Sequence, residues 1–265
     1  MSRSLPESLS GFIEEATPSE KTLLLVNRTG PEPLVRLLEK AFDGQSVRVA
    51  EAHRSESAED VVCLLEDEEV VATTPMADLE EAFLLVNADR YRTGVGQTET
   101  GSFPAVLTGL DEIEFEVRGF PKSDKEKLLL VLISRFIEAR ALWRGTGELH
   151  STFQRLSRLD DEYGTRSMYE ALADTDVSAH VYGVRDDPSA VDALDVTVHA
   201  GEGEEYRRSW VVAFDPLDDA GDAPDAEGGP VALVAIETGP NVWRGTWTYD
   251  PGRVAWIRSY LDRNF

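Results

Sequence analysis

The sequence predicts a mixed α/β (α+β) fold, with a β-α-β N-terminal lobe and a mixed-sheet C-terminal lobe that ends in a helix. Three observations lead to this prediction. Short apolar runs of strand length alternate with helical patterns in the first third of the chain, a strongly apolar helix is expected near the middle, and short strands crowd the second half. We place the two lobes at residues 1–121 and 122–265, with one continuous domain as the alternative.

The N-terminal lobe is expected to begin with a helix that runs to about Ala16. Ser4 to Glu7 has the spacing of a capping box, with a proline in the first turn. The next three elements, a strand at 21–27, a helix at 31–42 and a strand at 46–50, form a β-α-β unit with a parallel strand pair. The remaining elements of this lobe are strands at 60–65 and 69–73, a helix at 76–86, a loop at 87–101 and a strand at 112–117.

The C-terminal lobe is expected to begin with a helix over residues 124–142, behind a second capping box at Ser123–Glu126. The centre of this helix is apolar on all sides, so we expect it to lie buried between layers. Residues 149–154 are compatible with a strand or with a continuing helix. The remaining elements are a helix at 159–172, strands at 179–184, 195–199, 210–214, 231–237 and 244–249, an acidic surface loop at 215–229, and a terminal helix from Asp250-Pro251 with Val254, Ile257, Tyr260 and Leu261 facing inward.

The charge of the chain indicates where it works. It contains 50 acidic and 26 basic residues, for a net charge of −24, and only five of the basic residues are lysines. Excess carboxylates repel one another in dilute buffer, and concentrated salt screens that repulsion. We therefore expect a halophilic protein from the cytosol of a salt-accumulating microbe. A nucleic-acid partner is disfavoured, because no stripe of Lys and Arg is present to contact phosphates.

Neither a membrane segment nor a disulfide framework is expected. The N-terminus lacks an apolar signal core, and the longest apolar stretch, Leu128 to Ile133, is far too short to span a bilayer. Cys63 is the single cysteine and lies in an apolar run, so we interpret it as a small buried hydrophobe. These features predict a soluble, cytoplasmic protein.

The sequence contains no complete catalytic, metal or cofactor site. Residues 93–97 begin like a glycine-rich phosphate loop, but Glu99 occupies the sixth position and no strand precedes the segment. Glu148 and His150 would share one face of a strand, which supplies two ligands where zinc needs three or four. We therefore predict no metal, no cofactor and no enzymatic activity.

Two clusters rich in tryptophan and glycine occur in the second half, at residues 143–154 and 243–251. Trp combines a large apolar ring with one N–H donor, so such segments suit a concave pocket, with plain core packing as the equal alternative. In a pocket, Arg144 would hold an anionic group, Trp rings would stack on a planar one, and His150 and Gln154 would set its orientation. The residues predicted to bind a ligand are Trp143, Arg144, Glu148, His150, Gln154, Glu237, Trp243 and Trp247.

At these clusters the chain resembles the DICT sensory domain family, most of all its stand-alone type in salt-loving archaea. The matching segments span about residues 134 to 265: they are 134–141, 145–157, 180–184, 210–212, 232–237 and 243–251. Thr152 departs from the family pattern, which usually has glycine at this position. The resemblance implies a signal-input domain that passes a signal to a partner protein and has no established reaction.

We therefore predict a non-catalytic cytosolic module that binds a small ligand or relays a signal to a partner protein. A protein-interaction module without a ligand is the first alternative, and it requires tryptophans that lie flat and exposed. An enzyme of unrecognised type is the second. It requires Glu148 and His150 to come within hydrogen-bond reach of each other in a cleft.

Overall fold

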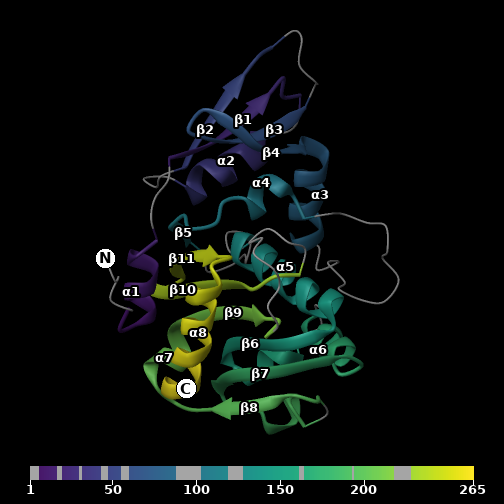
Figure 1. Ribbon diagram of the computed structural model, residues 1–265, viewed down its shortest axis with the longest axis vertical. Coiled ribbons are helices and arrows are strands. Elements are labelled where there is room, and N and C mark those ends of the chain that lie inside the picture. The colour runs from purple at the N-terminus through teal and green to yellow at the C-terminus, as the bar shows by residue number, and fades with distance from the viewer. Residues whose placement is uncertain are drawn as a thin grey trace.

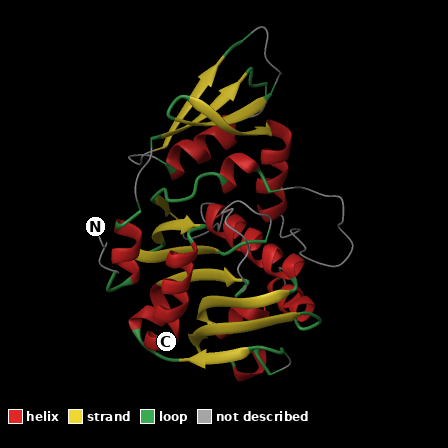
Figure 2. Ribbon diagram, viewed as in Figure 1, coloured by secondary structure: helices red, strands yellow, loops and turns green. Residues whose placement is uncertain are grey.

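The computed structural model describes residues 6–16, 20–29, 32–42, 47–54, 60–87, 103–118, 128–160, 164–192, 194–217 and 228–265. Within these residues the chain has the predicted mixed α/β fold, with one four-stranded and one seven-stranded sheet. The smaller sheet lies at the top of the molecule in Figure 1, and the larger sheet fills the lower part. Helices lie between the two sheets and beside the larger one (Figure 2).

The smaller sheet has the strand order β2-β1-β3-β4. Its elements are β1 (Lys21–Val26), α2 (Glu32–Ala41), β2 (Val47–Ala52), β3 (Val61–Glu66), β4 (Glu69–Pro75) and α3 (Met76–Asn87). β1 and β2 pair in parallel, so the predicted β-α-β unit is confirmed. β3 and β4 form an antiparallel hairpin, in which Asp67 and Glu68 both have the positive φ of a tight primed turn.

The larger sheet has the strand order β5-β11-β10-β9-β6-β7-β8. Its strands are β5 (Phe115–Arg118), β6 (Thr146–Arg155), β7 (Asp176–Val184), β8 (Thr197–Ala200), β9 (Ser209–Asp215), β10 (Val231–Gly239) and β11 (Val242–Thr248). β6, β7 and β8 run parallel, and the other neighbouring pairs are antiparallel. Residues 149–154 therefore belong to a strand, and the alternative of a continuing helix is wrong.

Helices cover both faces of the larger sheet. α5 (Leu128–Arg144) and α6 (Thr165–Leu172) pack on one face, and α1 (Leu9–Glu14), α7 (Glu204–Arg208) and α8 (Pro251–Asn264) pack on the other. α8 begins as predicted, because the Asp250 side chain accepts a hydrogen bond from the Arg253 N–H at 2.8 Å. The four residues predicted to face inward from α8 are all buried.

Several local predictions need correction. α1 begins at Leu9, where the Ser8 hydroxyl accepts a hydrogen bond from the Gly11 N–H, and not at the capping box of Ser4. The helix predicted at 159–172 begins only at Thr165, because Gly164 adopts a φ of +99° just before it. Cys63 is half-buried rather than buried. The short helices α4 (Ala105–Thr108) and α7 were not predicted.

Three predicted features lie wholly or largely outside the described residues: the capping box at 123–126, the glycine-bearing segment at 93–99 and most of the acidic loop at 215–229.

The two sheets share one hydrophobic core. A continuous cluster of buried side chains extends from Leu23 and Leu64 of the smaller sheet, through Ile133 of α5, to Leu233 of the larger sheet. β5 and α1 precede residue 122, yet β5 pairs with β11 and α1 packs on β10. The predicted boundary between residues 121 and 122 therefore does not coincide with a division between the sheets.

Gly147, at the start of β6, occupies a place that only glycine fits. Its φ is +120°, and a Cβ at this position would lie 2.5 Å from the Asp215 carbonyl oxygen on β9. Gly145 also has a positive φ, +71°, but a Cβ there would meet nothing within 4 Å. Gly147 is therefore constrained by conformation and by space, and Gly145 by conformation alone.

We predict that Gly147→Ala lowers the free energy of unfolding by about 2–4 kcal/mol, whereas Gly145→Ala lowers it by about 1–2 kcal/mol. The difference reflects the close approach of the Asp215 backbone. Urea denaturation in concentrated KCl, followed by circular dichroism, measures both losses. Equal losses in the two variants would contradict this account of Gly147.

Candidate functional site

The larger sheet separates the predicted ligand-binding residues into two groups. Side chains alternate between the two faces of a strand, so the face of each residue follows from its position. One group, on β6, faces α8: Glu148, His150 and Gln154. The other group lies on the α5 side: Glu237, Trp243 and Trp247 on β10 and β11, together with Trp143 and Arg144 on α5 itself. The single pocket expected from these eight residues is therefore not assembled, because the sheet itself stands between them.

The tryptophans of the second cluster belong to the hydrophobic core. Trp247 is fully buried and packs on the Phe115 ring, with ring centroids 5.6 Å apart. Trp243 is 2% exposed and lies edge-on to Trp210 at 5.7 Å. For these two residues, core packing is the correct interpretation.

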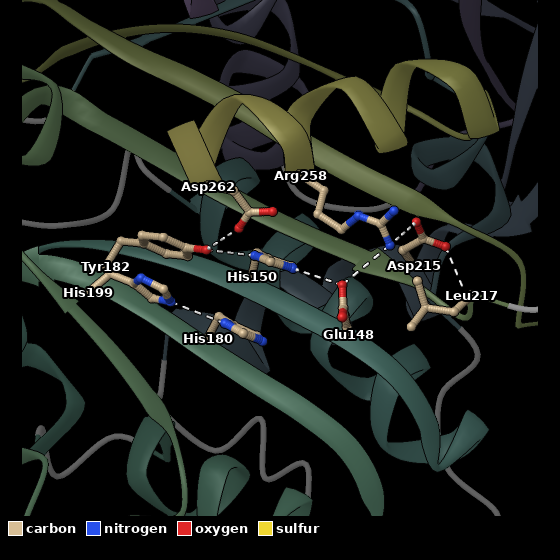
Figure 3. Close-up of polar contacts among 9 residues, drawn as sticks. All are labelled: Glu148, His150, His180, Tyr182, His199, Asp215, Leu217, Arg258 and Asp262. Atoms are coloured by element: carbon tan, nitrogen blue, oxygen red, sulfur yellow. Dashed lines mark hydrogen bonds and ion pairs between the residues drawn. The ribbon is translucent and has the colours of Figure 1, made fainter. Parts of the chain in front are cut away.

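A cluster of aromatic and titratable side chains lies between the larger sheet and α8 (Figure 3). This histidine cluster consists of His150 on β6, His180 and Tyr182 on β7, and His199 on β8. Parallel pairing places His150 beside His180 and Tyr182 beside His199. The rings of each pair stack, with centroids 4.6 Å apart in the first and 4.3 Å apart in the second.

Hydrogen bonds connect the histidine cluster to α8. Nδ1 of His150 lies 2.8 Å from the Tyr182 hydroxyl, and its Nε2 lies 3.4 Å from a Glu148 carboxylate oxygen. A neutral His150 satisfies both contacts if Nε2–H donates to Glu148 and Nδ1 accepts from the Tyr182 hydroxyl. Arg258 of α8 then pairs with Glu148 at 3.3 Å and with Asp215 of β9 at 3.1 Å.

Burial shifts the pKa values of His150, His199 and Tyr182 so that their neutral forms are favoured. Desolvation lowers the pKa of His150 to about 4; the neighbouring His180 adds to this shift, and the hydrogen bond to Glu148 opposes it. Burial, and then the proximity of His180, lower the pKa of His199. Burial also raises the pKa of the Tyr182 hydroxyl, and the nearby Asp262 carboxylate adds to this effect.

Glu148 and His150 lie close to each other, but the His150 ring is buried. His150 is 2% exposed, and both of its ring nitrogens contact neighbouring side chains. Glu148 is also engaged by Arg258 of the covering helix. The pair therefore connects β6 to α8.

The sequence missed most of the residues that connect His150 to α8. Tyr182, Arg258 and Asp262 were not among the predicted site residues. His180 and Tyr182 are two residues apart on a predicted strand, and Arg258 and Asp262 are four apart on a predicted helix, so each pair could have been placed on one face. The strand register that places His180 and Tyr182 beside His150 has no signal within a few neighbouring residues, and neither does the packing of α8 over them.

A cavity of about 740 Å³ lies between the smaller sheet and α5, and we call it the inter-sheet cavity. Phe136, Arg140 and Trp143 line it from α5, at the i, i+4, i+7 spacing of one helix face. Phe103 and Tyr249 line the same space, and both contact the Phe136 ring edge-on. Of the eight predicted ligand residues, only Trp143 is among the described residues that line this cavity.

Arg140 and Trp143 contribute different chemistry to the inter-sheet cavity. The Arg140 guanidinium carbon lies 5.7 Å from the Phe136 ring centroid and 5.4 Å from that of Tyr249, within the range of cation–π attraction. Trp143 is 65% exposed, although Trp rings are usually well buried. Its neighbour Arg144 lies at the end of α5 and is not among the described lining residues.

The part of the chain that the structure describes contains neither a group of possible metal ligands nor a helix suited to cross a membrane. No three of its His, Cys, Asp or Glu side chains are grouped so that they could hold a metal ion. None of its helices combines the length and the apolar character needed to cross a bilayer.

Comparison with known proteins does not assign a family. No protein-family model matches the chain, and no curated protein matches its sequence. Among solved structures, the chain is similar to polyphosphate kinase from Porphyromonas gingivalis, with 11% sequence identity and a TM-score of 0.29. That match covers 96% of this chain and 47% of the kinase chain, and at so low a TM-score it carries no argument.

We predict that His150 makes the protein less stable as the pH falls. Its pKa is about 4 in the folded protein and 6.5 in an unfolded chain, so below pH 6.5 the unfolded state takes up a proton that the folded state excludes. Between pH 7 and about pH 5 this difference removes about 1–2 kcal/mol of stability. The loss should be smaller in His150→Gln, as measured by urea denaturation in concentrated KCl at each pH.

His53→Gln is the matched control for this prediction, because His53 is exposed and lies beyond the end of β2. It should lose stability with falling pH as the unmodified protein does. The same loss in His150→Gln would contradict a neutral, buried His150.

Proposed function

We propose that this chain is a non-catalytic cytoplasmic sensory module, which binds a small ligand in the inter-sheet cavity and relays its occupancy to a partner protein. The cavity is the observation that carries the proposal. Its volume of about 740 Å³ lies within the range of small-molecule sites, and it combines aromatic walls with a few polar groups.

The position of the inter-sheet cavity suits a sensor, because elements on both sides contribute to it. Lys21 and Ala72 line it from the smaller sheet, Trp143 from α5, and Tyr249 from the segment after β11. A ligand that contacts both sides favours those arrangements of the two sheets in which all its contacts are made. Binding would thereby change the surface that a partner protein meets.

The resemblance to the DICT sensory domain family supports the same function. The matching segments overlap α5, β6, β7, β9, β10, β11 and the start of α8. The cavity wall at Phe136, Ala139 and Arg140 lies in the first of these segments. The non-catalytic part of the proposal is supported by the burial of His150 and by the ion pair of Glu148 with Arg258.

The interaction-module alternative has one observation in its favour. Trp143 is 65% exposed, and an exposed indole is a frequent anchor of protein interfaces. Trp243 and Trp247 do not support it, because both are buried in the core.

We predict that a low-molecular-mass fraction of a halophilic cell extract changes the tryptophan fluorescence in a saturable way in concentrated KCl. Trp143, on the cavity wall, should report the change. Trp256 serves as the control, because it is 7% exposed and stacks on Phe12 on the α8 side of the larger sheet. The change should persist in Trp256→Phe and disappear in Trp143→Phe.

Binding can be tested separately from the fluorescent reporter by filling the cavity. Ala139 lines the cavity, so Ala139→Phe should abolish the heat of binding in calorimetry. Ala171→Phe, at a half-buried position on α6, should retain it. A different outcome is that no fraction binds and that a partner protein co-purifies only when Trp143 is present. The sensory function is then wrong, and the chain is a protein-interaction module without a small ligand.

A further inference from the structure

We infer that the inter-sheet cavity binds an organic cation, in which an ammonium group is carried on a flat aromatic body. This inference rests on the proposed function, because it names the ligand class of that same site. It follows from the partners of the four charged side chains in the described lining and from the aromatic wall of the cavity.

The two basic side chains of the described lining are already engaged by the protein itself. Lys21 Nζ donates to the Gly109 carbonyl oxygen at 2.9 Å, and to the carbonyl oxygen and Oδ1 of Asp111 at 3.2 Å each. The Arg140 guanidinium lies over two aromatic rings of the cavity wall and has a further interaction besides these contacts. An anionic ligand would have to share or displace these contacts, so the lining does not favour one.

The two acidic side chains of the described lining differ in their partners. Asp111 is paired with Lys21 through its Oδ1. The Glu66 carboxylate has neither a hydrogen bond nor an ion pair within the part of the chain that the structure describes. Glu66 therefore leaves one negative charge in the cavity lining that a bound cation can neutralise.

The fold directs Glu66 toward the cavity. Glu66 is the last residue of β3, and Val62 and Leu64, four and two residues before it, are fully buried in the core shared with α5. Side chains alternate along a strand, so Glu66 lies on the same face as both. Glu66 is half-buried. A carboxylate that has lost part of its hydration attracts a positive charge more strongly than one in open water does.

The aromatic wall favours an organic cation over a metal ion. Phe103 and Phe136 meet edge-on with ring centroids 4.9 Å apart, and Tyr249 meets Phe136 edge-on at 6.4 Å. Trp143 continues this wall with a ring that is 65% exposed. A flat aromatic body can stack on such a ring, whereas a metal ion would leave the wall in contact with water. An unpaired carboxylate beside an aromatic wall thus matches an aromatic ammonium compound.

Concentrated salt does not remove this preference. The net charge of −24 attracts every cation alike, and salt screens the part of it that is exposed on the surface. A pair of charges enclosed in a cavity is screened much less. Selectivity for a cation should therefore persist in concentrated KCl, and it should depend on Glu66 and not on the net charge of the chain.

A matched set of three probes tests the inference near neutral pH: naphthylmethylammonium, naphthylmethanol and naphthoate. They share one aromatic ring system and differ in charge. In concentrated KCl, calorimetry should show naphthylmethylammonium binding about tenfold more tightly than naphthylmethanol, with naphthoate the weakest of the three. Equal affinity for the ammonium and the alcohol, or a preference for naphthoate, would overturn the inference.

Two variants assign the charge preference to Glu66. Glu66→Gln should weaken the binding of naphthylmethylammonium by about tenfold and leave the affinity for naphthylmethanol unchanged. Glu202→Gln removes the same charge from an exposed position between β8 and α7, so it should leave all three affinities unchanged. Equal weakening in both variants would show that net charge sets the preference, and it would contradict the inference.

Trp143→Leu tests the aromatic wall separately, and it keeps the test decisive if Glu66→Gln fails to fold. Trp143 is 65% exposed, so this variant should fold normally. It should weaken the binding of all three probes by a similar factor of about three to ten, because the stacking surface is lost. An unchanged affinity for naphthylmethylammonium in Trp143→Leu would overturn the proposed stacking.

The outcome for the ligand class is distinguishable from that for the sensory function. If none of the three probes binds, yet an extract fraction binds and Ala139→Phe abolishes that binding, the ligand class is wrong and the proposed function stands. If neither the probes nor any extract fraction binds, the proposed function itself fails.

Discussion

The packing of α5 on both sides is the constraint on which the rest of the structure depends. Its apolar side chains, among them Leu130, Ile133 and Ile137, are buried in a core shared by α3 and the larger sheet. Burial of this apolar surface against two layers fixes which face of the helix is turned away from the core. That face carries Arg140 and Trp143, and it becomes one wall of the inter-sheet cavity.

Several buried charged and polar side chains have partners inside the core. Arg135 donates to Glu138 at 2.8 Å and to the Thr165 hydroxyl at 2.9 Å, and both charged groups are buried. Lys21 is enclosed by oxygen atoms, and His150 stays neutral. A buried charge without such partners would cost several kcal/mol. These contacts therefore hold neighbouring elements in one arrangement, in addition to the apolar core.

The fold could be predicted further than the candidate site, because its signals are local. The run at Lys21–Val26 and the cap at Asp250-Pro251 are each contained in a few residues, and the structure confirms both elements. The sharing of one face by Glu148 and His150 could also be predicted from alternation along a strand. Glu148 and His150 lie on the opposite face of the sheet from Trp247. This placement follows from the pairing of β6 with β9 and of β9 with β10, and that pairing depends on contacts between distant segments. The stacking of Tyr182 on His199 depends on β7–β8 register in the same way.

The buried polar contacts of α5 also restrict which part of the molecule can move. The Ser134 hydroxyl accepts a hydrogen bond from the Trp210 indole N–H at 2.9 Å, and Arg135 bonds to Thr165 of α6. Rotation of α5 about its axis would break both contacts inside the core, where water cannot replace them. The larger sheet, α5 and α6 thus form a fixed frame. Relative to the larger sheet, α5 is therefore held in one rotational position, with Arg140 and Trp143 on the wall of the inter-sheet cavity.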